Sequence, residues 1–355
     1  MGKTSEKTEF VKKYYGQMLQ GVHDFKTAAC CCGAESFDPA IRDIEKHLDK
    51  EILTKFYGCG SPIPPVLEGC SVLDLGCGTG KDVFIASRLV GEKGYVVGVD
   101  MTDEQLEVAQ RHLEPQMDKF GYSKPNVAFK KGYIEDLRDI GIEDNSIDIV
   151  ISNCVINLAS DKEAVFKEIF RVLKPGGELY FSDVFSGRRV PEDIANDPVL
   201  HSECLGGAMY IEDFRRMLRR VGCPDYRVAA RHKVKINNPE IMARVGMVDF
   251  YSMTIRAFKL ESLEDNCEDY GQVAVYKGSI SGCSHTFGLD AHYSFISGEP
   301  VRVCGNTALM LQETRFATHF EVTGDRSVHY GPFDCAPAHE NRDSEDESGG
   351  ECCRR

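Results

Sequence analysis

Two motifs that would assign a metal or redox function at once are absent from this sequence. It contains no Cys-x-x-Cys pair and no His-Glu-x-x-His, although 15 of its 355 residues are cysteine. The first absence excludes a zinc ribbon and a thioredoxin-like motif, and the second excludes the helix of zinc proteases. In a reducing compartment, cysteines outside such frameworks indicate metal binding, catalysis or redox chemistry rather than a disulfide scaffold.

The sequence also has few signs of a membrane or nucleic-acid role. No apolar run approaches the ~20 residues of a membrane span, and residues 1–7 lack the apolar core of a signal peptide. The net charge is −14 and no stripe of Lys and Arg is present, so a nucleic-acid substrate is disfavoured. We therefore expect a cytoplasmic protein without membrane or nucleic-acid partners, and a monomer by default.

A strand, a glycine-rich turn and a helix follow one another early in the chain. Residues 72–75 are mostly apolar, as in a buried parallel strand. Gly76, Gly78 and Gly80 then alternate with other residues, and residues 81–90 carry apolar side chains at helical spacing. This layout places a nucleotide-like ligand at the N-terminus of a helix.

The spacing of the turn narrows the kind of ligand. The dinucleotide fingerprint needs glycine where this chain has Lys81, and the P-loop needs other residues than Leu75 and Asp82. The sequence that is present, D-L-G-C-G-T-G from Asp74, resembles the first motif of class I methyltransferases that use S-adenosylmethionine. Asp100 ends the next strand, where a carboxylate can accept hydrogen bonds from ribose hydroxyls. An unliganded turn or a degenerate dinucleotide site is the alternative.

Strands and helices alternate over the first two hundred residues. We predict strands at 72–75, 94–100, 127–130, 146–151 and 178–182, and helices at 5–27, 39–53, 81–90, 102–120 and 162–173. This order predicts an α/β fold, a parallel Rossmann-like sheet with helices on both faces. After residue 200 the pattern changes, and a further helix is predicted at 211–221.

Three cysteines lie in distinctive surroundings. Cys154 is in S-N-C-V-I-N-L, directly after the fourth strand, where methyltransferases face the methyl group. Cys204 lies in E-C-L-G-G-A, and Cys59 lies in Y-G-C-G. Together these motifs resemble the arsenite methyltransferase family, over residues 10 to 325 or so. For Cys154 taken alone, a small buried thiol acting as a hydrophobe is the alternative.

The resemblance implies a set of sulfur ligands for trivalent arsenic. Cys154 and Cys204 correspond to the pair that holds arsenic throughout, and Cys59 corresponds to a third ligand in a mobile N-terminal loop. The fourth family cysteine falls in a run of three, of which the first two are the better candidates: Cys30, Cys31 and Cys32.

The resemblance also implies residues that contact the cofactor. Met101 corresponds to the apolar residue that packs against the adenine, and Ile134 and Glu135 belong to the turn that contacts it. Asn153 is expected to form a hydrogen bond with the cofactor, and Tyr57 can stack on its sulfonium. The alternative is an ordinary core or surface residue for Met101, Ile134 and Glu135, core packing for Tyr57 and a turn cap for Asn153.

Soft thiolates suit trivalent arsenic, which is thiophilic. Three sulfurs leave a lone pair on arsenic, and this pair can attack the sulfonium methyl without a general base, through proximity and alignment. The resemblance further implies that a disulfide returns a transient pentavalent product to the trivalent state, and that thioredoxin or glutathione then reduces it. The predicted products are methyl- and dimethylarsenicals.

The lengths and patterns divide the chain into four parts. We predict a helical lid with cysteine loops at 1–65, a cofactor-binding core at 66–200 and an arsenic-binding, C-terminal α+β region at 201–335. Residues 336–355 are mostly charged or small, which predicts a disordered acidic tail.

Several residues have no clear motif context. Glu203 is expected either to form a hydrogen bond with a hydroxyl on arsenic or to be a surface carboxylate. The cysteines outside the motifs are expected to be structural or incidental: Cys70, Cys77, Cys223, Cys267, Cys283, Cys304 and Cys335. Two alternatives remain for the function, a methyltransferase of another small molecule and a thiol-rich metalloid-binding protein without catalysis.

Overall fold

The computed structural model describes residues 6–19, 24–27 and 39–335. Its strands are β1 (Ser71–Leu75), β2 (Tyr95–Asp100), β3 (Val127–Lys131), β4 (Ile147–Asn153), β5 (Leu173–Ser186), β6 (Met209–Tyr210), β7 (Arg227–Lys233), β8 (Phe250–Phe258), β9 (Glu268–Asp269), β10 (Val273–Tyr276), β11 (Thr286–Gly288), β12 (Ser294–Ile296), β13 (Pro300–Arg302), β14 (Phe320–Thr323) and β15 (Gly331–Pro332). An eight-stranded sheet runs in the order β3-β2-β1-β4-β5-β8-β7, with β6 beside β5. Strands β1 to β6 pair in parallel, which confirms the predicted α/β class.

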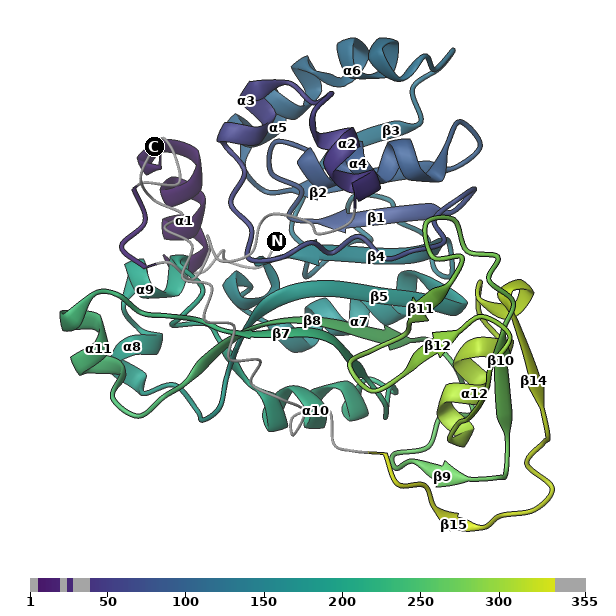
Figure 1. Cartoon of the computed structure of the whole chain (residues 1–355). Helices are drawn as coiled ribbons and strands as arrows, with labels where there is room; N and C mark the ends of the chain where they lie inside the picture. The colour runs from purple at the N-terminus through teal and green to yellow at the C-terminus, as the bar shows by residue number, and fades with distance from the viewer. Residues whose placement is uncertain (1–5, 20–23, 28–38, 336–355) are drawn as a thin grey trace.

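Helices cover both faces of this sheet (Figure 1). They are α1 (Glu6–Lys13), α2 (Pro39–Glu45), α3 (Lys50–Thr54), α4 (Lys81–Val90), α5 (Asp103–Arg111), α6 (Leu113–Phe120), α7 (Lys162–Val172), α8 (Glu192–Ala195), α9 (Pro198–Ser202), α10 (Ile211–Arg220), α11 (Pro239–Val245) and α12 (Gly305–Gln312), with short π or 3₁₀ turns at Tyr14–Met18, Ile156–Leu158 and Ala317–His319. Apolar side chains of α2, α4 and α6 share one core cluster, and those of α7 and α10 share another.

Strand β1 shows why both faces need helices. Val72 contributes to the core cluster under α4, whereas Leu73 and Leu75 contribute to the cluster under α7. Successive side chains of a strand point to opposite faces, so a strand that is apolar throughout must be covered twice. The predicted helix at 81–90 is confirmed at both ends by α4.

Three predicted helices were too long. The helix predicted at 102–120 is divided into α5 and α6, because Pro115 has no N–H to donate to Arg111. The one predicted at 39–53 is divided into α2 and α3, where the Asp49 side chain accepts from the Glu51 N–H and starts a new helix. The one predicted at 5–27 ends in a π-helical turn that contains Gly16, and Leu19 after it is extended.

The main sheet continues beyond residue 200, where the sequence suggested a separate region. Strand β8 pairs antiparallel with the long β5, and β7 pairs antiparallel with β8. Strand β5 was predicted only at 178–182, because Pro175, Gly176 and Gly177 read as a helix stop. Four helices, α8 to α11, lie between β5 and β8, but they do not alternate one by one with parallel strands, so the pattern that signals a parallel sheet was missing. The boundary at 200 therefore does not coincide with an edge of the sheet.

A second, smaller unit follows β8. It contains a three-stranded sheet in the order β13-β10-β14, the pairs β11–β12 and β9–β15, and helix α12. Its own core cluster includes Phe287, Phe295 and Phe316, all buried. Figure 1 shows this unit at one end of the main sheet, with α1 and α9 beside each other at the opposite end. The acidic tail at 336–355 lies outside the described residues.

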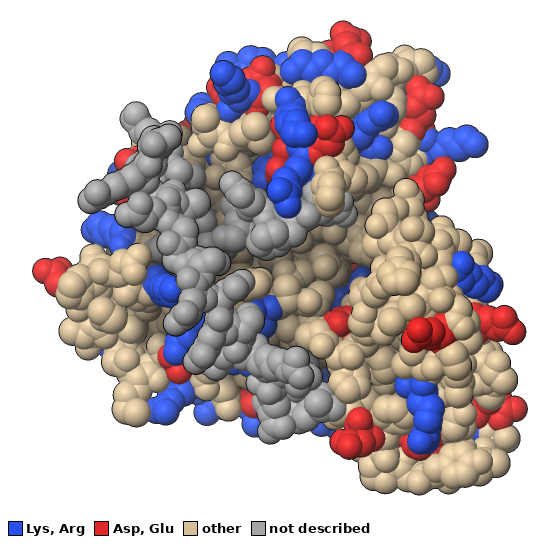
Figure 2. Space-filling model, viewed as in Figure 1, with Lys and Arg blue, Asp and Glu red and all other residues tan. Residues whose placement is uncertain are grey.

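The surface carries charges of both signs. On the face shown in Figure 2, Lys and Arg side chains are interspersed with Asp and Glu over the described residues. Within the same part of the chain, no helix combines the length and the apolar character that crossing a bilayer requires.

Candidate active site

One cavity lies beyond the carboxyl ends of β1 to β4, where the ligand of an open parallel sheet is expected. Ten of the residues proposed from the sequence line it: Tyr57, Asp74, Gly76, Gly78, Asp100, Met101, Ile134, Glu135, Asn153 and Cys154. Gly80 does not line the cavity and instead precedes the first residue of α4. Other residues that were not selected from the sequence also line the cavity: Tyr15, Phe56, Asp82, Thr102, Gln105 and Leu158.

The turn between β1 and α4 requires its glycines. Gly76, Gly78 and Gly80 have φ values of +72°, +52° and +86°, which side chains rarely allow. A Cβ on Gly76 would lie 2.3 Å from Val155, and one on Gly80 would lie 2.8 Å from Phe129. A Cβ on Gly78 would meet only Gln105 at 3.8 Å, so this glycine opens onto the cavity.

Acidic side chains gather beside this turn. The Asp100 carboxylate accepts from the backbone N–H groups of Gly78 (2.9 Å) and Thr102 (2.8 Å). Burial, and then the neighbouring Asp82 and Asp100 carboxylates, raise the pKa of Asp74 well above its usual range. A buried group of carboxylates is costly unless a cation offsets it. The site therefore fits a positively charged ligand such as a sulfonium.

Gln105 supplies a second indication that the cavity holds a polar ligand. Its Oε1 atom is buried and has no hydrogen-bond partner among the described residues, while its Nε2 donates to the Tyr15 carbonyl (3.1 Å). A buried acceptor without a donor costs free energy. A ligand hydroxyl or amine in the cavity would satisfy it.

The side-chain amide of Asn153 already forms hydrogen bonds within the protein. Its Nδ2 donates to the Gly60 carbonyl (2.8 Å) and to Asp82 (3.0 Å), and its Oδ1 accepts from the Cys59 N–H (3.1 Å). These bonds tie the Cys59 loop to the end of β4. The predicted hydrogen bond to the cofactor stays a prediction, because the amide serves first to position the loop.

Tyr57 and Glu135, the aromatic and acidic candidates, both contact other side chains of the protein. Tyr57 packs against the rings of Tyr15 and Phe25, and burial raises its pKa. The Glu135 carboxylate accepts from the N–H and the hydroxyl of Ser160 (3.1 and 3.2 Å). Both side chains therefore have protein partners at the cavity wall, and their contacts with a cofactor stay predictions.

Three cysteines from different segments meet at one edge of the cavity. Cys59 and Cys154 form a disulfide, with Cα atoms 5.9 Å apart. The Cys204 thiol donates to the Cys154 carbonyl (3.3 Å). The sulfurs of Cys154 and Cys204 and a carboxylate oxygen of Asp183 all lie within 4.8 Å of one another. The sequence motifs predicted this group of sulfurs, but they did not indicate Asp183.

The backbone holds this pair of cysteines in a rare conformation. Cys154 and Cys204 have φ values of +57° and +66°, in the left-handed region that non-glycine residues seldom adopt. Hydrogen bonds from their N–H groups to the carbonyls of Ser182 (2.8 Å) and His201 (3.0 Å) fix them there. Strained backbone of this kind persists where the surrounding structure determines it, typically at functional sites.

Comparison with known proteins identifies the family of this chain. An arsenite methyltransferase of Aquipseudomonas alcaligenes is 48% identical over 326 residues, which are 92% of this chain and 93% of the relative. The chain belongs to the arsenite methyltransferase family. The mouse arsenite methyltransferase is 44% identical, with 88% of this chain and 82% of the mouse protein covered.

Family models and a solved structure agree with this membership. A methyltransferase domain model matches residues 67–222, and an arsenite methyltransferase C-terminal domain model matches residues 269–355. The crystal structure of an arsenic(III) S-adenosylmethionine methyltransferase from Chlamydomonas reinhardtii is 51% identical, with a TM-score of 0.82. It covers 84% of this chain and all of that chain. The predicted fold and cofactor are thereby confirmed.

In this member of the arsenite methyltransferases, Glu203 is not a surface carboxylate, and its hydrogen bond to a hydroxyl on arsenic stays a prediction. The side chain is fully buried, and its carboxylate accepts from the Tyr14 hydroxyl (2.8 Å) and the N–H groups of Lys26 and Thr27 (both 2.7 Å). It therefore anchors the N-terminal segment next to Cys204. Long-range bonds of this kind leave no local sequence signal.

Asp183 is the residue whose carboxyl group lies beside the sulfurs of Cys154 and Cys204. Burial raises its pKa to about 7, against the opposing effect of hydrogen bonds from the N–H groups of Val184 and Asn157. Its position at the end of the sheet follows from β5, which runs four residues beyond the predicted end at 182. Cys30, Cys31 and Cys32 lie outside the described residues, so the predicted fourth cysteine has no position here.

Proposed function

We propose that this chain transfers methyl groups from S-adenosylmethionine to trivalent arsenic held by Cys59, Cys154 and Cys204, and that it yields methyl- and dimethylarsenicals. One observation carries the proposal: Cys154 lies both in the wall of the cofactor cavity and in the group of sulfurs. A thiol in this position brings a bound metalloid to the place where a methyl donor would sit.

The cavity residues hold the cofactor in this proposal. Bound S-adenosylmethionine supplies an electrophilic methyl group on a sulfonium. Asp100 keeps the glycine turn in place through Gly78 and offers its carboxylate to ribose hydroxyls. Asp74 and Asp82 also line the cavity, and a bound cation would favour the ionised form of these buried carboxyl groups. Tyr57, Met101 and Ile134 provide apolar walls.

The sulfurs capture arsenic by ligand exchange. Arsenous acid exchanges three As–O bonds for three As–S bonds, and each thiol proton leaves with a hydroxyl as water. The lone pair left on arsenic attacks the methyl carbon, and no proton has to be removed in that step. The contribution of the protein is therefore proximity and alignment.

The disulfide between Cys59 and Cys154 is an oxidised form of the same site. Methyl transfer removes an electron pair from arsenic, which becomes pentavalent. Two bound thiolates can return this pair by leaving as a disulfide: two As–S bonds break, one S–S bond forms, water adds its hydroxide to arsenic and releases a proton, and arsenic becomes trivalent again. When Cys59 and Cys154 form this disulfide, Cys204 alone still holds the arsenic, in contrast to the constant Cys154–Cys204 pair that the family resemblance implies. A dithiol or glutathione must then reduce the disulfide. Thioredoxin or glutathione is the proposed reductant, in a reducing compartment such as the cytoplasm.

An assay of arsenic speciation tests this function. The protein is incubated with arsenite and methyl-labelled S-adenosylmethionine, with and without a dithiol. We expect methyl- and dimethylarsenicals with the dithiol, and at least a tenfold lower yield without it when the protein starts in the disulfide form, since Cys154 is then unable to bind arsenic. A control without arsenite should give no labelled product. Cofactor binding without any methylated arsenic would contradict the proposal.

A further inference from the structure

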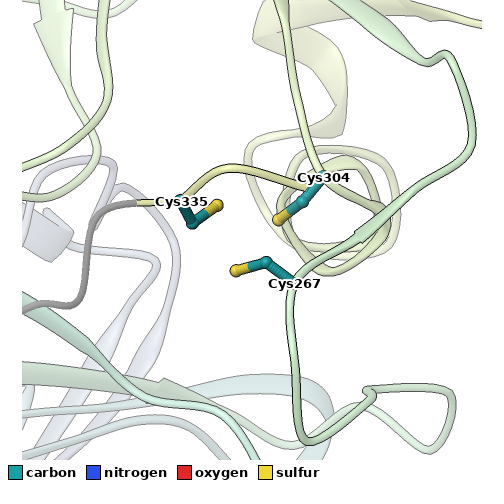
Figure 3. A group of neighbouring side chains, drawn as sticks. All are labelled: Cys267, Cys304 and Cys335. Carbon is teal, nitrogen blue, oxygen red and sulfur yellow. The ribbon is translucent and has the colours of Figure 1, made fainter. Parts of the chain in front are cut away.

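A second group of three cysteine sulfurs lies far from the methyl-transfer cavity. The sulfurs of Cys267, Cys304 and Cys335 are all within 4.8 Å of one another. Figure 3 shows the three side chains, from three separate segments, with their sulfurs turned toward a common space. None of the three lies in a recognisable sequence motif, and we expected each to be structural or incidental. Their convergence is a property of the fold.

The strand pairing and a helix start bring these residues together. Strands β9 and β15 pair antiparallel, and the Phe333 N–H donates to the Cys267 carbonyl (2.8 Å), so Cys335 comes back beside Cys267. Cys304 is the residue before α12, and its N–H donates to the Tyr293 hydroxyl (3.3 Å). The strand pairing and the hydrogen bond to Tyr293 therefore fix the backbone at all three cysteines.

The group is reachable from outside. Cys304 is fully buried, whereas Cys267 and Cys335 are half-buried. Both of the latter line a cavity of about 260 Å³. A small solute can therefore reach two sulfurs directly and the third behind them.

The charged side chains around the three cysteines favour a trivalent ion over a divalent one. Arg227 is buried, donates to the Cys304 sulfur (3.6 Å) and pairs with Asp225 (2.8 Å) and Asp290 (3.5 Å). Its positive charge is thus already offset by two carboxylates. Three thiolates on a divalent ion such as zinc would add a net negative charge to this buried region, which is costly. Three thiolates on a trivalent ion add none.

The number of ligands leads to the same choice. Among the described residues, the group includes no fourth His, Cys, Asp or Glu. Structural zinc sites are almost always four-coordinate and tetrahedral. An ion that is satisfied by three sulfurs and carries a lone pair in the fourth direction matches the group better.

We propose that Cys267, Cys304 and Cys335 form a second binding site for trivalent arsenic, separate from the site of methyl transfer. Arsenous acid binds there by exchanging three hydroxyls for three thiolates with release of three waters, and no electrons are transferred. Figure 1 shows β9 and α12, which adjoin Cys267 and Cys304, across the molecule from α9, which adjoins Cys204. The site binds arsenic whether or not the chain methylates it.

Arsenic stoichiometry in a background without the first site tests the proposal. The reduced full-length chain carrying Cys59→Ser, Cys154→Ser and Cys204→Ser is dialysed against arsenite, and bound arsenic is counted by elemental mass spectrometry. We expect Cys304→Ser, added to this background, to remove about one arsenic per chain. The matched control is Cys283→Ser, a cysteine of the same unit outside the group, which should remove none. Cysteines outside the described residues contribute equally to both samples.

Two further measurements separate the outcomes. Arsenic X-ray absorption of the background protein should show three sulfur neighbours, and Cys335→Ser, at a half-buried position, should reduce bound arsenic in the same way as Cys304→Ser. Equal arsenic in Cys304→Ser and Cys283→Ser would overturn the proposal, as would one tightly held zinc with no arsenic uptake. Methylation by the unaltered chain is assayed separately, so a failure there would affect only the proposed function.

Discussion

Replacement of Cys154 by serine is expected to abolish arsenic methylation. Loss of a direct ligand should lower kcat/KM at least about 100-fold, the upper range measured for partners one step further from a metal. A serine oxygen is a hard ligand and binds trivalent arsenic poorly. The assay contains a dithiol, which reduces the Cys59–Cys154 disulfide of the unaltered chain, so both proteins start in the reduced form. The affinity for S-adenosylmethionine, measured by calorimetry, should change by less than about threefold, under 1 kcal/mol.

Cys223→Ser is the matched control for this prediction. Cys223 is buried in another part of the core, and its thiol donates to the Asp225 carbonyl (3.2 Å), a bond that a serine hydroxyl can also make. This variant should keep its methylation activity. If Cys154→Ser retained more than a tenth of the activity, the arsenic would not be held by this sulfur, and methylation of another nucleophile would become the better interpretation.

Replacement of Asp100 by alanine should weaken cofactor binding without affecting arsenic. The carboxylate accepts from the N–H groups of Gly78 and Thr102, and the variant leaves both donors without this partner. Affinity for S-adenosylmethionine falls because the ribose hydroxyls lose a charged acceptor, and a hydrogen bond to a charged group contributes about 1.5–3 kcal/mol, so we expect a roughly 10- to 100-fold loss. Calorimetry with the cofactor and dialysis with arsenite measure the two effects separately.

Asp103→Ala controls for a general effect of lost negative charge. Asp103 lies three residues further on, in the first turn of α5, and its exposed carboxylate pairs with Lys131. Removing an exposed pair of this kind changes little, so cofactor affinity should be unchanged. Equal affinities for the Asp100→Ala and unaltered chains would place the cofactor somewhere other than the cavity beyond β1 and β2.

The local parts of the fold could be predicted from the sequence. The apolar run before Gly76, the glycines themselves and the periodicity of 81–90 are short-range signals, and the structure follows them at both ends of α4. The cysteine motifs likewise placed Cys154 at the end of a strand, because a residue after a parallel strand must lie at the carboxyl edge of the sheet.

The remainder depends on contacts between distant segments. Strand β8 joins the sheet through antiparallel pairing with β5, and the helices α8 to α11 that lie between them in the sequence do not alternate regularly with strands, so no local pattern signals this pairing. Glu203 has its partners at Tyr14, Lys26 and Thr27, between 176 and 189 residues earlier in the chain. No spacing rule links such positions, so contacts between their side chains become visible only in the folded structure. The same holds for the second group of cysteines.

The most direct measurement is the position of arsenic in crystals of the reduced protein grown with arsenite and S-adenosylhomocysteine. Anomalous scattering at the arsenic edge locates the element without reference to the chain. The account predicts a site bonded to the sulfurs of Cys59, Cys154 and Cys204, facing the ligand that occupies the cavity beside Asp74 and Asp100. Density for the ligand in that cavity, with no arsenic at these three sulfurs once the disulfide is reduced, would contradict it.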